Sequence, residues 1–292
     1  MKLSSFCVPC KGKRFYEVTC LSTKSERKRK STMDYVVKSI AESAKTKECP
    51  SFAGTKQSEL IMRLTGNKDP YRKKKLDVIK RAKAIYPEFE KRVFGGETDY
   101  ERFRRAAVIA VAGNALELSA PNHKIELANL RKEMWKLVKG GLACDDLKKI
   151  IGKANGAESI LYLCDNCGEA VFDRLLISEL KKCAPLTIAV ASSPVDEDVS
   201  MKEAGLLGLG KLASVVGKGR TYGVWKEKAP KGFWKKLEGA GLIIAKGMGN
   251  YETLTEYPKL ARGRTAFLFM VKCEPVGKSI GLRKGSLVAK MF

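Results

Sequence analysis

Four short apolar segments, each followed at once by polar or glycine residues, most constrain the fold of this chain. They span residues 159–163, 186–191, 241–245 and 265–271. Continuous apolar runs of this length are typical of strands that are buried on both faces, as in a parallel sheet. Ligands of open parallel sheets bind beyond the carboxyl ends of the strands. We therefore expect the residues that follow the four segments to line one crevice.

The residues after these segments suit a divalent cation that faces a phosphate group. Asp165 and Asn166 follow the first segment, Asp198 comes after the second, and Lys246 follows the third. Carboxylate and amide oxygens are ligands of hard cations such as Mg²⁺ or Mn²⁺, and a lysine ammonium binds phosphate oxygens. Each loop alone could be an ordinary turn with a helix cap, because Asp and Asn bond nearby backbone N–H groups. Taken together, the loops predict metal-assisted phosphoryl chemistry.

Two glycines follow Lys246 and precede a helix predicted over residues 250–257. Gly247 and Gly249 would expose backbone N–H groups near the start of that helix, where anions bind well. We expect this segment to contact the phosphate of a substrate.

The remaining pattern predicts an α/β fold class. Residues 31–94 carry apolar residues at three- and four-residue steps, which predicts helices, and Gly95-Gly96 is the best break signal. Further helices are predicted over 100–118, 122–138, 145–154, 169–182 and 233–237, and further strands over 212–216 and 286–290. This order predicts a doubly wound α/β/α sandwich with a mainly parallel sheet, preceded by an all-helical amino-terminal domain. We expect a helical domain over 1–96 and a Rossmann-like domain over 97–292 that carries the predicted metal and phosphate site.

The composition narrows the possible locations and partners. No run of about 18 apolar residues is present, and the first residues lack the apolar core of a secretory signal, so we expect a cytoplasmic protein without membrane contact. The nine cysteines are an odd count, which favours free thiols. The formal net charge of +24 attracts anions of every kind. The basic runs at 24–30 and 71–75 lack the aromatic residues and glycine-rich clamps of RNA-binding modules. Because of the net charge, binding of nucleic acid or nucleotide without hydrolysis is the alternative function. The composition of the basic runs makes it the less favoured one.

Five ordered motifs carry a family resemblance along nearly the whole chain. They are Cys7-Val8-Pro9-Cys10, Gly-Asn-Lys-Asp-Pro-Tyr at 66–71, Gly-Asn-Ala-Leu-Glu at 113–117, Asp-Asn-Cys-Gly-Glu at 165–169, and Lys-Gly-Met-Gly-Asn-Tyr-Glu at 246–252. Their order resembles that of the damage-control phosphatase family, DUF89 or ARMT1-like. The closest resemblance is to its prokaryotic stand-alone subfamily I, which has an amino-terminal Cys-x-x-Cys motif.

The resemblance implies a metal-dependent phosphatase of small phosphorylated metabolites, such as sugar phosphates, nucleotides or their damaged forms. A metal-activated water would attack the phosphate ester. Manganese or nickel is the expected metal, and cobalt or magnesium is possible. By motif position, the metal ligands are Asp165, Asn166 and Asp198, and Asp165 and Lys246 are catalytic. The substrate side is assigned to Asn114, Glu169, Lys246, Gly247, Gly249, Asn250 and Glu252.

The chain departs from the family pattern at three places. Glu197 stands where the family has asparagine in the loop of the third ligand, so Asp196 or Glu197 could replace Asp198 as ligand. Met270 stands where the family has the first lysine of Lys-x-Lys-Cys-Pro, which weakens or alters the predicted grip on phosphate. Glu117 replaces an aspartate and is expected to shift a contact behind the ligands.

The thiols and the single histidine raise the question of other metal sites or a redox pair. Cys7 and Cys10 could bind a metal with a further thiol, such as Cys20 or Cys49, or form a redox pair. Together with Cys164 and Cys167 they could form a zinc site, although the spacing is far from that of a zinc ribbon. We predict instead that Cys164 and Cys167 are buried. His123 is the only histidine, so a His-rich metal site is excluded, and we expect it to be exposed near a helix start.

Overall fold

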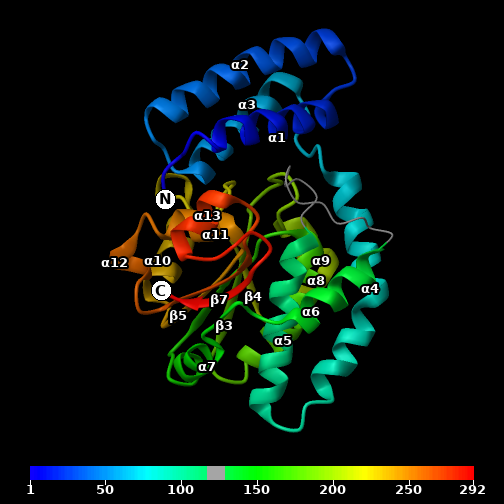
Figure 1. Ribbon diagram of the computed structural model, residues 1–292, viewed down its shortest axis with the longest axis vertical. Coiled ribbons are helices and arrows are strands. Elements are labelled where there is room, and N and C mark those ends of the chain that lie inside the picture. The colour runs from blue at the N-terminus through cyan, green and yellow to red at the C-terminus, as the bar shows by residue number, and fades with distance from the viewer. Residues whose placement is uncertain (117–128) are drawn as a thin grey trace.

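A seven-stranded sheet forms the centre of the protein (Figure 1). The structure is a computed structural model that describes residues 1–116 and 129–292. The strand order is β1-β7-β6-β5-β2-β3-β4, and every neighbouring pair is parallel except β6 and β7. The strands are β1 (Cys144–Asp145), β2 (Ile160–Leu163), β3 (Leu186–Val190), β4 (Ser214–Gly217), β5 (Leu242–Lys246), β6 (Thr265–Met270) and β7 (Leu287–Met291). The predicted mainly parallel sheet is confirmed.

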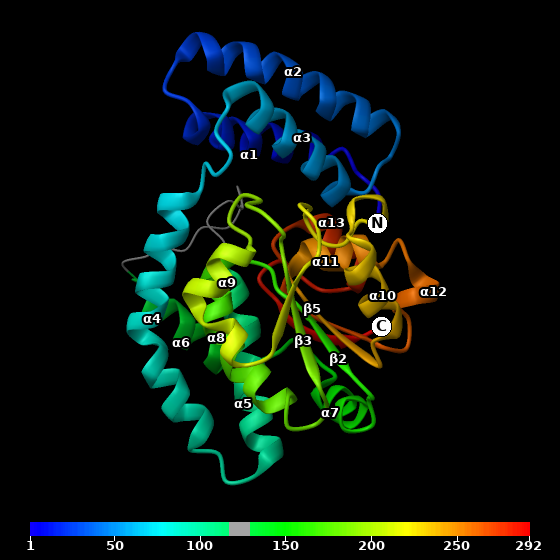
Figure 2. The same cartoon turned by 180° about the vertical axis from the view of Figure 1, so that it is seen from behind.

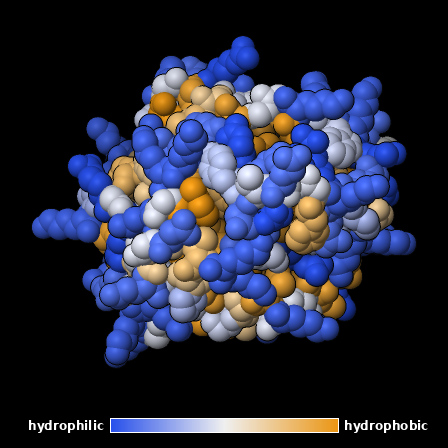
Figure 3. All heavy atoms as spheres, turned by 90° about the horizontal axis from the view of Figure 1, so that it is seen from below, coloured by the Kyte–Doolittle hydropathy of each residue, from blue (hydrophilic) through white to orange (hydrophobic). Residues whose placement is uncertain are grey.

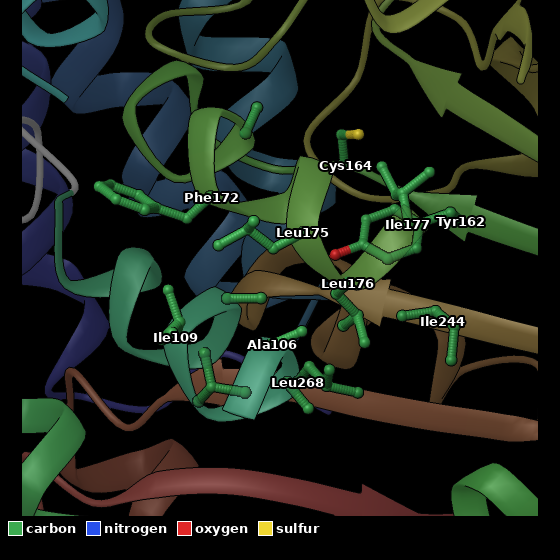
Figure 4. Close-up of a cluster of buried hydrophobic side chains, with 14 of the residues drawn as sticks. Ala106, Ile109, Tyr162, Cys164, Phe172, Leu175, Leu176, Ile177, Ile244 and Leu268 are labelled. Carbon is green, nitrogen blue, oxygen red and sulfur yellow. The ribbon is translucent and has the colours of Figure 1, made fainter. Parts of the chain in front are cut away.

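Helices cover both faces of the sheet, because the central strands are apolar on both sides. In β2, Ile160 and Tyr162 enter one core, while Leu161 and Leu163 enter the other. Figure 4 shows the first core, where α5 and α8 pack on β2, β5 and β6. Its helices are α4 (Arg72–Phe94), α5 (Asp99–Gly113), α6 (Leu130–Gly140), α7 (Leu147–Asn155), α8 (Cys167–Leu180) and α9 (Met201–Leu207). The other face carries α10 (Lys231–Gly239), α11 (Gly247–Leu254), α12 (Pro258–Ala261) and α13 (Glu274–Ile280).

Three amino-terminal helices form a separate layer, which we call the cap. They are α1 (Cys7–Ser22), α2 (Glu26–Lys45) and α3 (Pro50–Thr65), and they lie beyond the end of the sheet that carries α11 and α13 (Figures 1 and 2). The cap has its own small core of Phe15, Val18, Val36, Ile40 and Ile61, which Tyr71 joins from the start of α4. The predicted division after residue 96 separates α4 from α5, although both helices pack in the same core with α8. By packing, the separate helical unit is α1–α3.

Some predicted boundaries differ from the observed ones. Cys144–Asp145 pairs with β7 as a two-residue strand, so the helix predicted from residue 145 begins at Leu147. The helix predicted over 250–257 begins at Gly247. The helix predicted over 122–138 appears as α6, and its first part lies outside the described residues, as do Glu117 and His123.

The face of the molecule opposite the cap is mostly hydrophilic (Figure 3). Figure 3 shows the end of the molecule away from the cap, where hydrophilic side chains surround small, scattered apolar areas. In the described part of the chain, no helix has both the length and the apolar character that a membrane span requires. The nine cysteines are free thiols.

Candidate active site

A cavity of about 160 Å³ lies between the cap and the carboxyl edge of the sheet. Its walls include residues of α1 and α3 from the cap, and residues that follow β2, β3, β4, β5 and β6 from the sheet side. The site residues predicted from the sequence that line it are Asp165, Asn166, Asp198, Gly249, Glu252, Cys7 and Cys10. The predicted convergence of the loops is therefore observed.

Asp165 is held in position by two amide side chains. It follows β2, and its Oδ2 accepts hydrogen bonds from Asn166 Nδ2 at 2.9 Å and from Asn114 Nδ2 at 3.1 Å. Asn114 is fully buried, and its Oδ1 accepts a hydrogen bond from the backbone N–H of Met270 at 3.1 Å. Because Asn114 joins the end of α5 to the end of β6, the orientation of the Asp165 carboxylate is fixed by the surrounding fold.

Asp198 brings a second carboxylate to the same place. A backbone bridge pairs Asp198 with Asn166, and the backbone N–H of Val199 donates to the carbonyl oxygen of Asp165 at 2.8 Å. The Oδ2 atom of Asp198 is buried without a hydrogen-bond partner and lies 3.9 Å from Lys218 Nζ. Burial and the charge of Asp165 hold the pKa of Asp198 well above its usual range. A divalent cation would remove this repulsion and satisfy the buried oxygen, so these residues fit such an ion.

The neighbouring carboxylate of Asp196 is directed to the cap instead. Its Oδ2 accepts hydrogen bonds from the hydroxyl of Tyr222 and from Arg14 Nη2, the latter at 3.3 Å, and its Oδ1 accepts one from Ser58 Oγ at 3.2 Å. Asp196 has a positive φ of 39°, a backbone conformation that is uncommon for residues other than glycine. Asp196 is one of two alternatives to Asp198 as the third metal ligand. Its carboxylate is bonded to other side chains instead. The backbone carbonyl of Glu197 accepts a hydrogen bond from the N–H of Cys167 at 2.9 Å.

Lys246 differs from its prediction as a phosphate-facing cation. Its side chain is 0% exposed and does not line the cavity. Its Nζ donates to Asp173 Oδ1 at 2.6 Å and to the carbonyl oxygen of Ala110 at 2.8 Å, and it lies 3.6 Å from Glu169 Oε1. Burial opposes the charge of Lys246, but Asp173 and Glu169 hold its pKa above the usual value. The partner Asp173, which lies inside α8, gave no motif signal in the sequence.

Other residues assigned to the substrate side are also buried, close to Lys246. Glu169 is fully buried and accepts a hydrogen bond from Asn114, and burial raises the pKa of Glu169 to about 8 despite the charge of Lys246. Asn250 is fully buried, and its Nδ2 donates to the carbonyl oxygen of Lys246 at 2.7 Å. Asn114, Glu169, Lys246 and Asn250 therefore support the cavity from beneath, and the structure gives them no place on its wall.

Gly247 allows the closest approach in the site. Its φ is +74°, and a Cβ atom at this position would lie 1.9 Å from Asp165 Oδ2. Only a residue without a side chain can occupy the turn from β5 into α11 while Asp165 keeps its position. The glycine predicted to face phosphate thus makes room for the candidate metal ligand.

The cap supplies cavity residues that the sequence analysis did not assign. Lys11 and Arg14 of α1 line the cavity with Cys7, and the spacing of these three residues places them on one face of a helix. Glu252 meets the cap through a hydrogen bond from Ser51 Oγ to its Oε2 at 2.7 Å. Prediction of a helix over the first 22 residues would have placed Lys11 and Arg14 on the same helix face as Cys7. It could not have shown which part of the protein this helix face contacts.

The Cys-x-x-Cys motif forms the first turn of α1. Cys7 and Cys10 are half-buried and line the cavity, as does Cys273 from the end of β6. Cys164 and Cys167 are buried, as predicted, and burial raises the pKa of both thiols. Across residues 1–116 and 129–292, no three His, Cys, Asp or Glu side chains are arranged to hold a metal. The four-thiol zinc site considered above is therefore not formed, and the candidate cation site has two carboxylates and an amide.

Comparisons with known proteins show the family of the chain. Residues 3–288 match the model of the damage-control phosphatase ARMT1-like domain. The chain is 32% identical to a damage-control phosphatase of Archaeoglobus fulgidus over 100% of its own length and 99% of the relative. It is 29% identical to a damage-control phosphatase of Pyrococcus horikoshii, over 99% of this chain and 97% of that one.

A solved structure shares the whole fold. The crystal structure of a DUF89 family protein from Pyrococcus horikoshii superposes with a TM-score of 0.88 at 28% identity, covering 100% of this chain and 99% of that one. The more specific assignment to the subfamily with the amino-terminal Cys-x-x-Cys motif stays a prediction. With a family model that spans nearly all residues, the chain belongs to the damage-control phosphatase ARMT1-like family.

Proposed function

We propose that this protein is a metal-dependent phosphatase that hydrolyses phosphate esters of small metabolites, including damaged ones. The observation that carries the proposal is the meeting of Asp165, Asn166 and Asp198 in one cavity, with a buried Asp198 oxygen that lacks a hydrogen bond. The names of the two relatives as damage-control phosphatases support the same class of reaction.

Asp165, Asn166 and Asp198 would hold the cation. From the family resemblance we favour Mn²⁺ or Ni²⁺, with Co²⁺ or Mg²⁺ as alternatives; of these ions, Mn²⁺ and Mg²⁺ suit oxygen donors best. When bound, such a cation would polarise a phosphoryl oxygen and increase the acidity of water. Asn114 and Asn166 orient the Asp165 carboxylate through their hydrogen bonds to Oδ2. The buried ion pair of Lys246 and Asp173 lies at the end of β5, where the turn with Gly247 begins.

The cavity also suits a small anionic substrate. Lys272, Lys11 and Arg14 bring positive charge to its walls. Its volume of about 160 Å³ is below the roughly 300–1,000 Å³ of sites for drug-sized ligands. A compact phosphorylated metabolite therefore fits better than a large one.

Binding of nucleic acid is supported less well. The second basic run includes Lys75, which is buried and pairs with Asp69 at 3.0 Å and with Glu203 at 3.1 Å. Lys75 is therefore not available to a phosphate backbone, whereas Arg72, Lys73 and Lys74 of the same run are exposed.

Phosphate release from a panel of sugar phosphates and nucleotides tests the proposal. We expect release that requires Mn²⁺, Ni²⁺, Co²⁺ or Mg²⁺ and stops with chelator. It should fall by roughly 100- to 1,000-fold in Asp165→Ala, since removal of one key electrostatic group costs about that much. Equal release by the wild type and folded Asp165→Ala would reject the assignment of the site. If the folded, metal-loaded wild type releases phosphate from none of the substrates, hydrolysis of these substrates is rejected.

A further inference from the structure

Lys11 is a buried cation whose charge is poorly compensated by the protein. Its residue exposure is 9%, and its Nζ donates one hydrogen bond, to the carbonyl oxygen of Pro50 at 2.7 Å. Its Nζ also lies 5.6 Å from the centre of the Phe15 ring. An ammonium group has three donors. Within the described ranges no carboxylate lies within 4.0 Å of Lys11 Nζ.

Three other buried lysines of the protein have acidic partners. Lys75 pairs with Asp69 and Glu203, Lys218 lies 3.9 Å from Asp198, and Lys246 pairs with Asp173. A buried charge normally requires such a partner, because its removal from water is costly. Lys11 is therefore placed where protein stability alone would not favour a lysine.

The surroundings of Lys11 point to the cavity as the source of the missing partner. Lys11 lines the same cavity as Asp165 and Asp198, but it comes from the cap and they come from the sheet. The acidic residue that acts on it is Glu252, whose carboxylate is already bonded to Ser51 Oγ. Burial lowers the pKa of Lys11 to about 8, with Arg14 adding to this effect and Glu252, Cys7 and Cys10 opposing it.

We propose that Lys11 binds an anionic oxygen of the substrate, so that the cap contributes directly to substrate recognition. This inference rests on the proposed function. The oxygen belongs either to the phosphoryl group itself or to a second anionic group, such as a carboxylate or another phosphate. In both cases the ligand supplies the charge that the protein does not.

The test compares Lys11→Met with Lys13→Met, which removes the same charge from an exposed position of α1 outside the cavity wall. Calorimetry measures the affinity of each metal-loaded protein for orthophosphate, and kinetics measures kcat and KM. The two matched substrates are propyl phosphate, and the same ester carrying a terminal carboxylate. Loss of one hydrogen bond to a charged group corresponds to an affinity change of roughly 10- to 150-fold.

Either of two results would support the role of Lys11. If its partner is the phosphoryl group, Lys11→Met weakens orthophosphate binding and raises KM for both substrates. If its partner is a second anion, orthophosphate affinity is unchanged and KM rises only for the carboxylated ester. In both cases KM of the wild type should rise as pH passes about 8, because Lys11 loses its proton, and Lys11→Met should lose this dependence.

The stability of Lys11→Met separates binding from a structural role. The midpoint of denaturant unfolding should be unchanged or higher, because methionine fills a similar volume without a buried charge. A clear drop in the midpoint, or unchanged KM and phosphate affinity in both assays, would overturn the proposal. If the wild type is active and Lys11→Met behaves identically, this inference alone fails. If the wild type neither binds phosphate nor hydrolyses the esters, the proposed function fails with it.

Discussion

Replacement of Lys246 by methionine is expected to lower the free energy of unfolding by about 3–5 kcal/mol, because it leaves two buried carboxylates without their cation. Asp173 and Glu169 are both fully buried, and Lys246 Nζ lies 2.6 Å from Asp173 Oδ1 and 3.6 Å from Glu169 Oε1. Chemical denaturation of Lys246→Met beside the wild type measures the loss. A change below about 1 kcal/mol would contradict the assigned ion pair.

The loss should also depend on pH. Burial raises the folded-state pKa of Glu169 to about 8 and that of Asp173 in the same direction, and the charge of Lys246 opposes both shifts. Without Lys246 both values rise further above those of the unfolded chain. A carboxyl group with a raised folded-state pKa stabilises the fold at low pH, and that contribution is lost as pH rises. Lys246→Met should therefore be closer to the wild type at about pH 5 than at about pH 8.

Two further variants make this test specific. Lys149→Met removes an exposed ion pair with Asp146, and its unfolding midpoint should stay at the wild-type value. Adding Asp173→Asn to Lys246→Met removes one of the stranded charges, so the double variant should be more stable than Lys246→Met alone. If the changes in unfolding free energy of the two single variants add up to that of the double variant, Lys246 and Asp173 do not interact.

Gly247→Ala is expected to disrupt the candidate cation site from the backbone side. The new Cβ would lie 1.9 Å from Asp165 Oδ2 and 2.2 Å from its Cγ, so Asp165 must move away from Asn114 and Asn166. The positive φ adds about 1–2 kcal/mol of backbone strain. A displacement of about 1 Å costs roughly 100-fold in rate, and we expect phosphate release to fall at least that far.

Gly249→Ala is the matched control in the same loop. Its Cβ would meet no atom closer than 3.5 Å, so its unfolding midpoint should remain near that of the wild type. Steady-state phosphate release and thermal unfolding of both variants provide the comparison. Gly247→Ala with wild-type activity and stability would mean that Asp165 is not confined by this turn.

Much of the fold could be predicted because the strands are buried on both faces. The run at 159–163 is apolar after Ser159, and residues 160–163 appear as β2 with side chains in both cores. By contrast, Cys144–Asp145 is too short to give a pattern, and its strand exists because β7 offers it a partner. The packing of α4 against α5 and α8 could not be predicted either, since the apolar stripe of α4 does not reveal which neighbour it contacts.

The candidate site could be predicted only in part. The carboxyl ends of parallel strands meet at one edge, so Asp165, Asn166 and Asp198 could be brought together from the sequence. The depth of a residue below the cavity could not be predicted. Lys246 comes at the end of an apolar segment, as a surface residue would, yet it is buried beneath the cavity in an ion pair with Asp173. Lys11 and Arg14 were missed because the docking of α1 over the sheet edge depends on contacts between distant residues, such as that of Arg14 with Asp196.

Binding of Mn²⁺ tests the central claim most directly, because it asks whether Asp165, Asn166 and Asp198 hold a cation without depending on the choice of substrate. We expect electron paramagnetic resonance titration to show one Mn²⁺ per chain, and an affinity at least about 100-fold weaker in Asp198→Asn, since even supporting residues of metal sites cost 10–100-fold. Asp196→Asn should retain the ion, because this side chain bonds to Tyr222, Arg14 and Ser58. Equal Mn²⁺ affinity in the wild type and Asp198→Asn, or loss only in Asp196→Asn, would contradict the assignment.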